Sequence, residues 1–135
     1  MKSFTTFIKE NLDSLTSNHI HSFLKHGESD EAKNQWGEKL SVLHKEPGSC
    51  SMVSNDLVKH LHKHGIKNAK TVTGSNPTNK KWNDVVDDLG QGGHHTVVKI
   101  GQHVVDLTRG QFEHNAPRVH IQHIDDFKKE WGNVI

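Results

Sequence analysis

The chain passes from loop to helix in the stretch Pro47-Gly48-Ser49-Cys50-Ser51-Met52-Val53, which contains its single cysteine. Downstream, Leu57 and Leu61 continue an apolar face at helical spacing, and Gly65 is typical of a helix end. Pro47 stops any preceding helix, because proline lacks an N–H and disfavours helix in the residue before it. We therefore expect a helix that begins at Cys50 and places the thiol at its N-terminus.

A β-hairpin is expected some 45 residues later. Two β-branched runs, residues 96–100 and 103–108, flank Gly101-Gln102, which is typical of a two-residue hairpin loop. Side chains of a strand alternate between the two faces of a sheet. In the register that this loop imposes, His95 and Asp106 share one face as diagonal cross-strand neighbours, so their side chains can meet.

The same register pairs Ile100 with His103 and directs His94 to the opposite face. A slip of one residue would exchange the faces of His94 and His95. His95 is therefore the main candidate for a functional histidine, and His94 is the reserve.

The remaining patterns predict helices first and strands afterwards. Apolar residues recur at helical spacing within residues 1–27, and Trp36, Leu40 and Leu43 outline a short second helix. Residues 28–35 are polar and predict an exposed connection. Further elements are expected in residues 69–73 (strand), 82–89 (helical turns), 119–121 (strand) and 125–131 (helix). This order is typical of the α+β class, with the Cys50 helix packed on a small antiparallel sheet.

Length and composition predict one domain, residues 1–135, without a strong preference for polyanions. The 135 residues match the commonest domain size, and 17 Lys and Arg balance 16 Asp and Glu without long blocks of either sign. We therefore expect neither nucleic-acid nor membrane binding. One cysteine cannot form an internal disulfide, and no apolar run approaches the roughly 18 residues of a membrane span. The expected location is the cytoplasm, with the protein soluble.

The residue types at these positions are those of nucleophilic catalysis. A helix N-terminus lowers the pKa of a thiol, because its unpaired N–H groups and its dipole favour negative charge. The same N–H groups can stabilise the oxyanion that forms when a thiolate attacks a carbonyl. Cys50, His95 and Asp106 therefore predict a single cysteine-centred site.

The order and spacing of these residues resemble the papain-like and transglutaminase-like cysteine enzymes. Gly48-Ser49-Cys50 is similar to the family's cysteine segment, and residues 104–112 are similar to the strand-end segment of small bacterial and phage members, some of them toxins or deamidases. The resemblance implies a papain-like fold and a cofactor-free hydrolase acting on a protein or small amide. It assigns Cys50 as nucleophile, His95 as general base and acid, and Asp106 as the residue that orients the imidazole.

The chain departs from this family at two positions. Papain relatives have a glutamine for the oxyanion hole six residues before the cysteine, where this chain has His44, and Ser51 replaces a tryptophan that often follows the cysteine. Other oxyanion or substrate-binding candidates are Ser51, Gln111 and Gln35. The alternative hypothesis is a non-catalytic interaction or inhibitor module of the same fold, for example a phage host-takeover protein.

Histidine and glycine clusters offer two further hypotheses. His60 and His64 lie one helical turn apart and could share a metal, but Leu61 stands where the zinc-protease pattern requires glutamate. A solvated helix face is the preferred interpretation, and no metal site is predicted. Gly90-Gln91-Gly92-Gly93 precedes a strand, whereas glycine loops that bind phosphate lead into helices.

Residues 1–10 are similar to the leaders of tailed-phage internal head proteins, which are removed after a Leu/Ile-x-Glu site. Here that site would be Ile8-Lys9-Glu10, and the mature chain would begin at Asn11. The resemblance implies packaging in a phage head and delivery into a host. Spacing alone favours an ordinary amphipathic helix.

Overall fold

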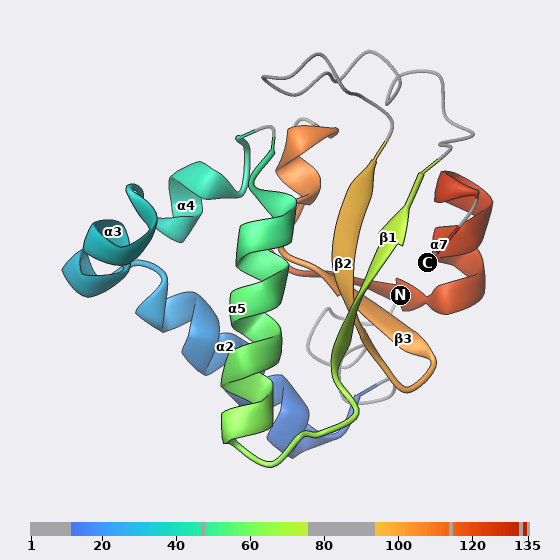
Figure 1. Cartoon of the computed structure of the whole chain (residues 1–135), viewed down its shortest axis with the longest axis horizontal. Helices are drawn as coiled ribbons and strands as arrows, with labels where there is room; N and C mark the ends of the chain where they lie inside the picture. Colours follow the sequence, from blue (N-terminus) through green and yellow to red (C-terminus); the bar gives the residue numbers. More distant parts are fainter. Residues whose placement is uncertain (1–11, 47, 76–93, 114, 133, 135) are drawn as a thin grey trace.

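A computed structural model describes residues 12–46, 48–75, 94–113, 115–132 and 134 of the chain. Within these residues, five α-helices and a short 3-10 helix surround a four-stranded antiparallel sheet (Figure 1). The predicted α+β class is confirmed. The expected leader, the turns at 82–89 and the glycine stretch at 90–93 lie outside the described residues.

The helices and strands follow the predicted order. The helices are α2 (Ser14–His26), α3 (Asp30–Trp36), α4 (Leu40–Leu43), α5 (Cys50–Lys63), the 3-10 helix η1 (Arg109–Gln111) and α7 (Ile124–Trp131). The strands are β1 (Lys70–Gly74), β2 (His95–Ile100), β3 (His103–Asp106) and β4 (His120–His123). None of the described helices combines the length and the apolar character that crossing a membrane requires.

The helix α3 corrects the expectation of an exposed connection over residues 28–35. The Ser29 side chain accepts a hydrogen bond from the Ala32 N–H at 3.1 Å, and Asp30 and Glu31 occupy the first turn, where negative charge is favourable. Gly37 ends the helix with a φ of 88°, so Trp36 belongs to α3, and the single helix predicted through Trp36, Leu40 and Leu43 is wrong: only Leu40–Leu43 forms α4. Capping and the fully buried Ala32 therefore form a helix where apolar periodicity gave no signal.

The helix α5 begins at Cys50, as predicted. Its apolar face is fully buried at Leu57 and Leu61, each with 0% exposure. Gly65 has a φ of 91°, a left-handed conformation that glycine adopts without steric cost and that commonly follows a helix. The helix packs on β1 and β2, with α2 against its outer side (Figure 1).

The predicted hairpin register is confirmed. Ile100 pairs with His103 and Val98 with Val105 across the loop at 101–102. β1 pairs with the other edge of β2, and β4 with the other edge of β3, so the strand order is β1-β2-β3-β4. The register therefore determines which side chains of β2 and β3 share a face.

Both faces of the sheet are covered, which makes the structure three-layered. On one face, Val98 and Val105 pack with the apolar side chains of α2, α4 and α5. On the other face, Val97 and Val104 pack with Phe127 and Trp131 of α7. Strand alternation places His95 and Asp106 on the same face as Val97 and Val104, which is the face that α7 covers. They lie close to the end of the sheet that the α5 N-terminus reaches.

Candidate active site

Cys50 is the first residue of α5, and its thiol is free and half-buried. The preceding Ser49 does not cap the helix through its side chain, because its hydroxyl donates instead to the carbonyls of Leu43 at 2.6 Å and Glu46 at 2.8 Å. The Ser49 hydroxyl therefore leaves the N–H groups of the first turn unoccupied. The helix dipole favours a negative charge on the sulfur.

Two serines dock the first turns of α5 onto the beginning of β2. The Ser54 hydroxyl donates to the Thr96 carbonyl at 3.0 Å, and the Ser51 hydroxyl lies 3.4 Å from the Thr96 hydroxyl. The Thr96 hydroxyl is itself 2.9 Å from that of Thr73 on β1. These contacts place Cys50 beside the residue that precedes Thr96, which is His95.

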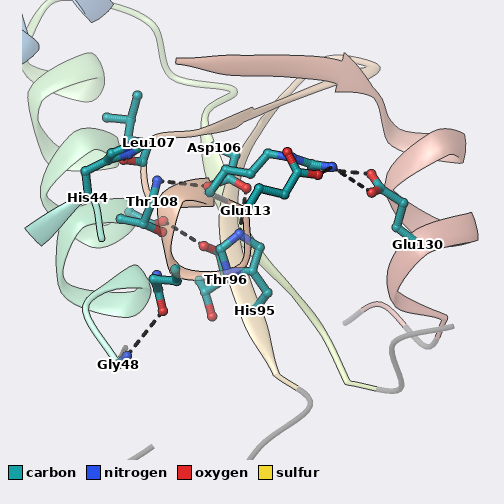
Figure 2. Close-up of polar contacts among 12 residues, drawn as sticks. His44, Gly48, His95, Thr96, Asp106, Leu107, Thr108, Glu113 and Glu130 are labelled. Carbon is teal, nitrogen blue, oxygen red and sulfur yellow. Dashed lines mark hydrogen bonds and ion pairs between the residues drawn. The ribbon is translucent and has the colours of Figure 1, made fainter. Parts of the chain in front are cut away.

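His95 and Asp106 form the contact that the hairpin register predicts. The His95 Nε2 lies 2.6 Å from Asp106 Oδ2, and the two residues are 1% and 2% exposed (Figure 2). The second oxygen of Asp106 accepts the Thr108 N–H at 2.9 Å. Both carboxylate oxygens are thus occupied, which fixes the imidazole in one orientation. His94 is exposed, so the geometry favours His95 over the reserve histidine.

An aromatic cage surrounds the His95 ring. The ring centroids of Phe112, Trp131 and Phe127 lie 4.6, 5.1 and 6.4 Å from that of His95. Sequence reasoning did not include these residues in the site, although Phe127 and Trp131 are one turn apart on a predicted helix. The cage keeps water from the His95–Asp106 pair and so strengthens its electrostatic interaction.

The electrostatics favour a thiolate beside an imidazolium. Burial raises the pKa of Cys50, but the hydrogen bonding and charge of His95 and the Thr96 N–H outweigh burial, so this pKa lies below its usual value. Burial lowers the pKa of His95, but the charge and hydrogen bond of Asp106, together with Cys50, raise it to about 9. For Asp106, burial raises the pKa, but the charge and hydrogen bond of His95 and the hydrogen bond from the Thr108 N–H outweigh burial. The pKa of Asp106 therefore lies below its usual value.

The His95 ring offers Cys50 its Nδ1 atom. Nε2 is bonded to Asp106, and Nδ1 is buried without a hydrogen-bond partner among the described residues. The Cys50 sulfur and this ring interact closely enough to lower the pKa of the thiol, although Nδ1 does not meet the geometry of a standard hydrogen bond. Such contacts between catalytic groups commonly tighten only when substrate binds.

Gln111 is the oxyanion candidate that the structure brings to this site. Its Oε1 accepts the Gly48 N–H at 3.2 Å, two residues before Cys50 (Figure 2). Its Nε2 is buried and, within the described part of the chain, has no hydrogen-bond partner. An amide that is anchored to Gly48 and has an unused donor is a candidate for binding a carbonyl oxygen near Cys50.

The other two oxyanion candidates are placed less favourably. Ser51 is exposed, and its hydroxyl interacts with Thr96. Gln35 is exposed on α3, which lies at the edge of the molecule away from the sheet (Figure 1). The structure does not bring Gln35 together with Cys50, His95 and Asp106.

His44, six residues before Cys50, makes a structural contact. Its ring is 2% exposed, and Nδ1 lies 3.0 Å from the Leu107 carbonyl, to which it must donate because a carbonyl only accepts. A Cβ at position 110 would lie 2.8 Å from His44 Nε2 and 2.9 Å from its carbonyl, so only glycine allows this approach. His44 therefore joins the end of α4 to the segment after β3.

Arg109 connects that segment to α7. Its guanidinium lies 2.8 Å from Glu113 and 2.8 Å from Glu130, and the arginine is 7% exposed (Figure 2). Burial lowers the pKa of Arg109, but the hydrogen bonds and charges of the two glutamates raise it above its usual value. Together with His44, this ion-pair group holds η1 and its Gln111 in place.

Comparisons of the chain with family models, with curated proteins and with solved structures found no match. The chemistry of the site follows from its own residues. A thiol at a helix N-terminus, an imidazole oriented by a buried carboxylate and an unused amide donor together provide the parts of nucleophilic acyl transfer.

Proposed function

We propose that this chain is a papain-like cysteine hydrolase that cleaves an amide bond, as a deamidase or a protease. The observation that carries the proposal is the 2.6 Å contact of His95 Nε2 with Asp106, which leaves Nδ1 of the same ring for Cys50. The order of nucleophile, base and orienting carboxylate follows the logic of catalytic triads. Asp106 holds the ring and stabilises its positive charge.

In the first half of the proposed reaction, the Cys50 thiolate attacks the carbonyl carbon of the amide, and the C=O electron pair moves to oxygen. The Gln111 amide and the N–H groups at the start of α5 stabilise this oxyanion. When the carbonyl re-forms, the C–N bond breaks, and the His95 Nδ1–H transfers its proton to the departing nitrogen. Ammonia or an amine leaves, and a thioester on Cys50 remains.

In the second half, the neutral His95 ring accepts a proton from water as the water oxygen attacks the thioester. The tetrahedral intermediate collapses, the C–S bond breaks, and the sulfur leaves as thiolate beside the protonated ring. The product is a carboxylic acid. The enzyme returns to its starting protonation state, so no cofactor is required by this cycle.

The small size of the chain favours a short acyl group over a long peptide in the site. A side-chain amide of a protein, or a free small amide, needs only a carbonyl pocket between Cys50 and Gln111. A role as a bacterial or phage effector, acting in the cytoplasm of a host, is part of the proposal through the sequence resemblance described above.

The experiment that tests this proposal is acyl-enzyme trapping with p-nitrophenyl acetate, followed by intact mass spectrometry. The native chain should gain one acetyl group that hydroxylamine removes, and Cys50→Ala should gain none. His95→Gln should acylate more slowly, with His94→Ala as the matched control that behaves as wild type. Gln111→Leu should slow acylation without changing the pKa of the thiol.

Acylation of the native chain that occurs only after unfolding would contradict the proposal, as would equal rates for His95→Gln and His94→Ala. That outcome would support the non-catalytic interaction module. One observation favours this second candidate: His44 uses its Nδ1–H on Leu107, so position 44 lacks the side-chain amide donor of papain relatives. Under this alternative, Cys50→Ala retains the biological activity of the chain.

A further inference from the structure

Three histidines converge where α2 packs against α5, away from the candidate active site. His19 lies on α2, and His60 lies on α5, with His64 directly at its C-terminal cap. One ring nitrogen of each lies within 4.8 Å of a ring nitrogen of both others. The sequence showed only that His60 and His64 lie one helical turn apart. Packing of α2 adds the third imidazole, which a spacing rule within one helix cannot reveal.

The His60 ring is prepared to act as a ligand. Its Nε2 is buried and has no hydrogen-bond partner among the residues that the structure describes. A buried ring nitrogen that no other group uses can direct its lone pair at a metal ion, and the His19 and His64 rings bring their nitrogens to the same place.

We propose that His19, His60 and His64 form a binding site for a divalent transition metal, with Zn²⁺ as the ion of reference. Three imidazoles suit Zn²⁺, Cu²⁺ or Ni²⁺ and do not suit Mg²⁺ or Ca²⁺, which require oxygen ligands. His64 is exposed, so a fourth position faces solvent and can take water or a further ligand.

Metal binding requires a small rearrangement of the rings. Zn–N bonds of about 2.0–2.1 Å place tetrahedral ligand nitrogens roughly 3.4 Å apart, closer than the present limit of 4.8 Å. His19 and His64 are now stacked, with centroids 4.4 Å apart and an interplanar angle of 17°. Rotation of the exposed His64 ring out of this stack brings its nitrogen toward His60. The bound metal then ties α2 to the end of α5 opposite Cys50.

Isothermal titration of the full chain with ZnCl₂ tests the proposal, with Cys50→Ala titrated in parallel to remove the thiol as a ligand. Both proteins should bind one Zn²⁺ at this site. His19→Ala and His64→Ala should each weaken Zn²⁺ binding by at least roughly 10- to 100-fold. Loss of a residue that only hydrogen-bonds to a metal ligand already has an effect of this size. His21→Ala, an exposed histidine on α2, is the matched control and should bind as wild type.

Thermal unfolding with and without Zn²⁺ provides a second readout, because a ligand that binds only the folded chain raises its melting temperature. The rise should persist in Cys50→Ala and disappear in His64→Ala. Equal binding by His64→Ala and His21→Ala would overturn the proposal, as would loss of binding in Cys50→Ala alone. The metal site does not use Cys50. Failure of Zn²⁺ binding and failure of the proposed hydrolase activity would therefore be separate results.

Discussion

Two histidine sites in this chain differ in how the imidazoles are held. In the first, His95 lies in a strand, is 1% exposed, and has one ring nitrogen bonded to Asp106. In the second, His19, His60 and His64 lie on or beside helices, and no carboxylate joins their group among the described residues. An anion raises the pKa of the first imidazole, whereas burial and neighbouring histidines lower the pKa of His60.

The difference shows that the partner of a histidine decides its chemistry more than its burial does. Burial alone lowers the pKa of both His95 and His60. At His95 the Asp106 carboxylate reverses this effect, which prepares the ring for proton transfer beside a thiol. No carboxylate is among the causes that shift the pKa of His60, and its buried Nε2 has no hydrogen-bond partner among the described residues.

The largest expected effect comes from truncating the aromatic residue next to each site. Phe127 borders His95 and Phe23 borders His60, and the two phenylalanines are 1% and 3% exposed. Phe127→Ala and Phe23→Ala should each destabilise the fold by about 3–5 kcal/mol, measured by urea unfolding. Only Phe127→Ala should slow alkylation of Cys50, and only Phe23→Ala should weaken Zn²⁺ binding. If each variant changes both properties, the two sites are coupled, and the comparison fails.

A smaller effect is expected from removing the charge of Asp106 while retaining its shape. Asp106→Asn removes the anion that raises the pKa of His95, so less imidazolium remains to stabilise the Cys50 thiolate. The rate of alkylation at pH 6 should fall about tenfold for each unit by which the thiol pKa rises. Asp126→Asn, on the exposed face of α7, is the charge-matched control. Equal alkylation rates for the two variants would show that Asp106 does not act on the thiol.

Much of the fold, and the central pair of the candidate site, could be predicted from the sequence. The two-residue loop at Gly101-Gln102 determines the hairpin register, and strand alternation then places His95 and Asp106 together. The start of α5 at Cys50 followed from apolar spacing and Pro47. These features depend on local rules, which a single sequence contains.

The remaining features depend on packing between distant segments. Gln111 reaches Gly48 across 63 residues, and His19 meets His60 only because α2 lies against α5. The helix α3 was missed because capping and one small buried residue, rather than an apolar stripe, define it. Gln35 was a candidate by residue type alone, and α3 carries it away from the site.

The dependence of Cys50 alkylation on pH, measured with iodoacetamide on the folded native chain, tests the central claim most directly. Below the lowered pKa of Cys50 the thiol is protonated and unreactive; above it, the thiolate forms beside the charged His95. Because Cys50 and His95 are coupled, the pair loses its two protons in separate steps. The second proton leaves the His95 ring near pH 9. We predict reactivity that begins below the ordinary thiol pKa of about 8.5, with a second inflection near pH 9. A single rise at the ordinary thiol pKa, or labelling only after unfolding, would contradict the account.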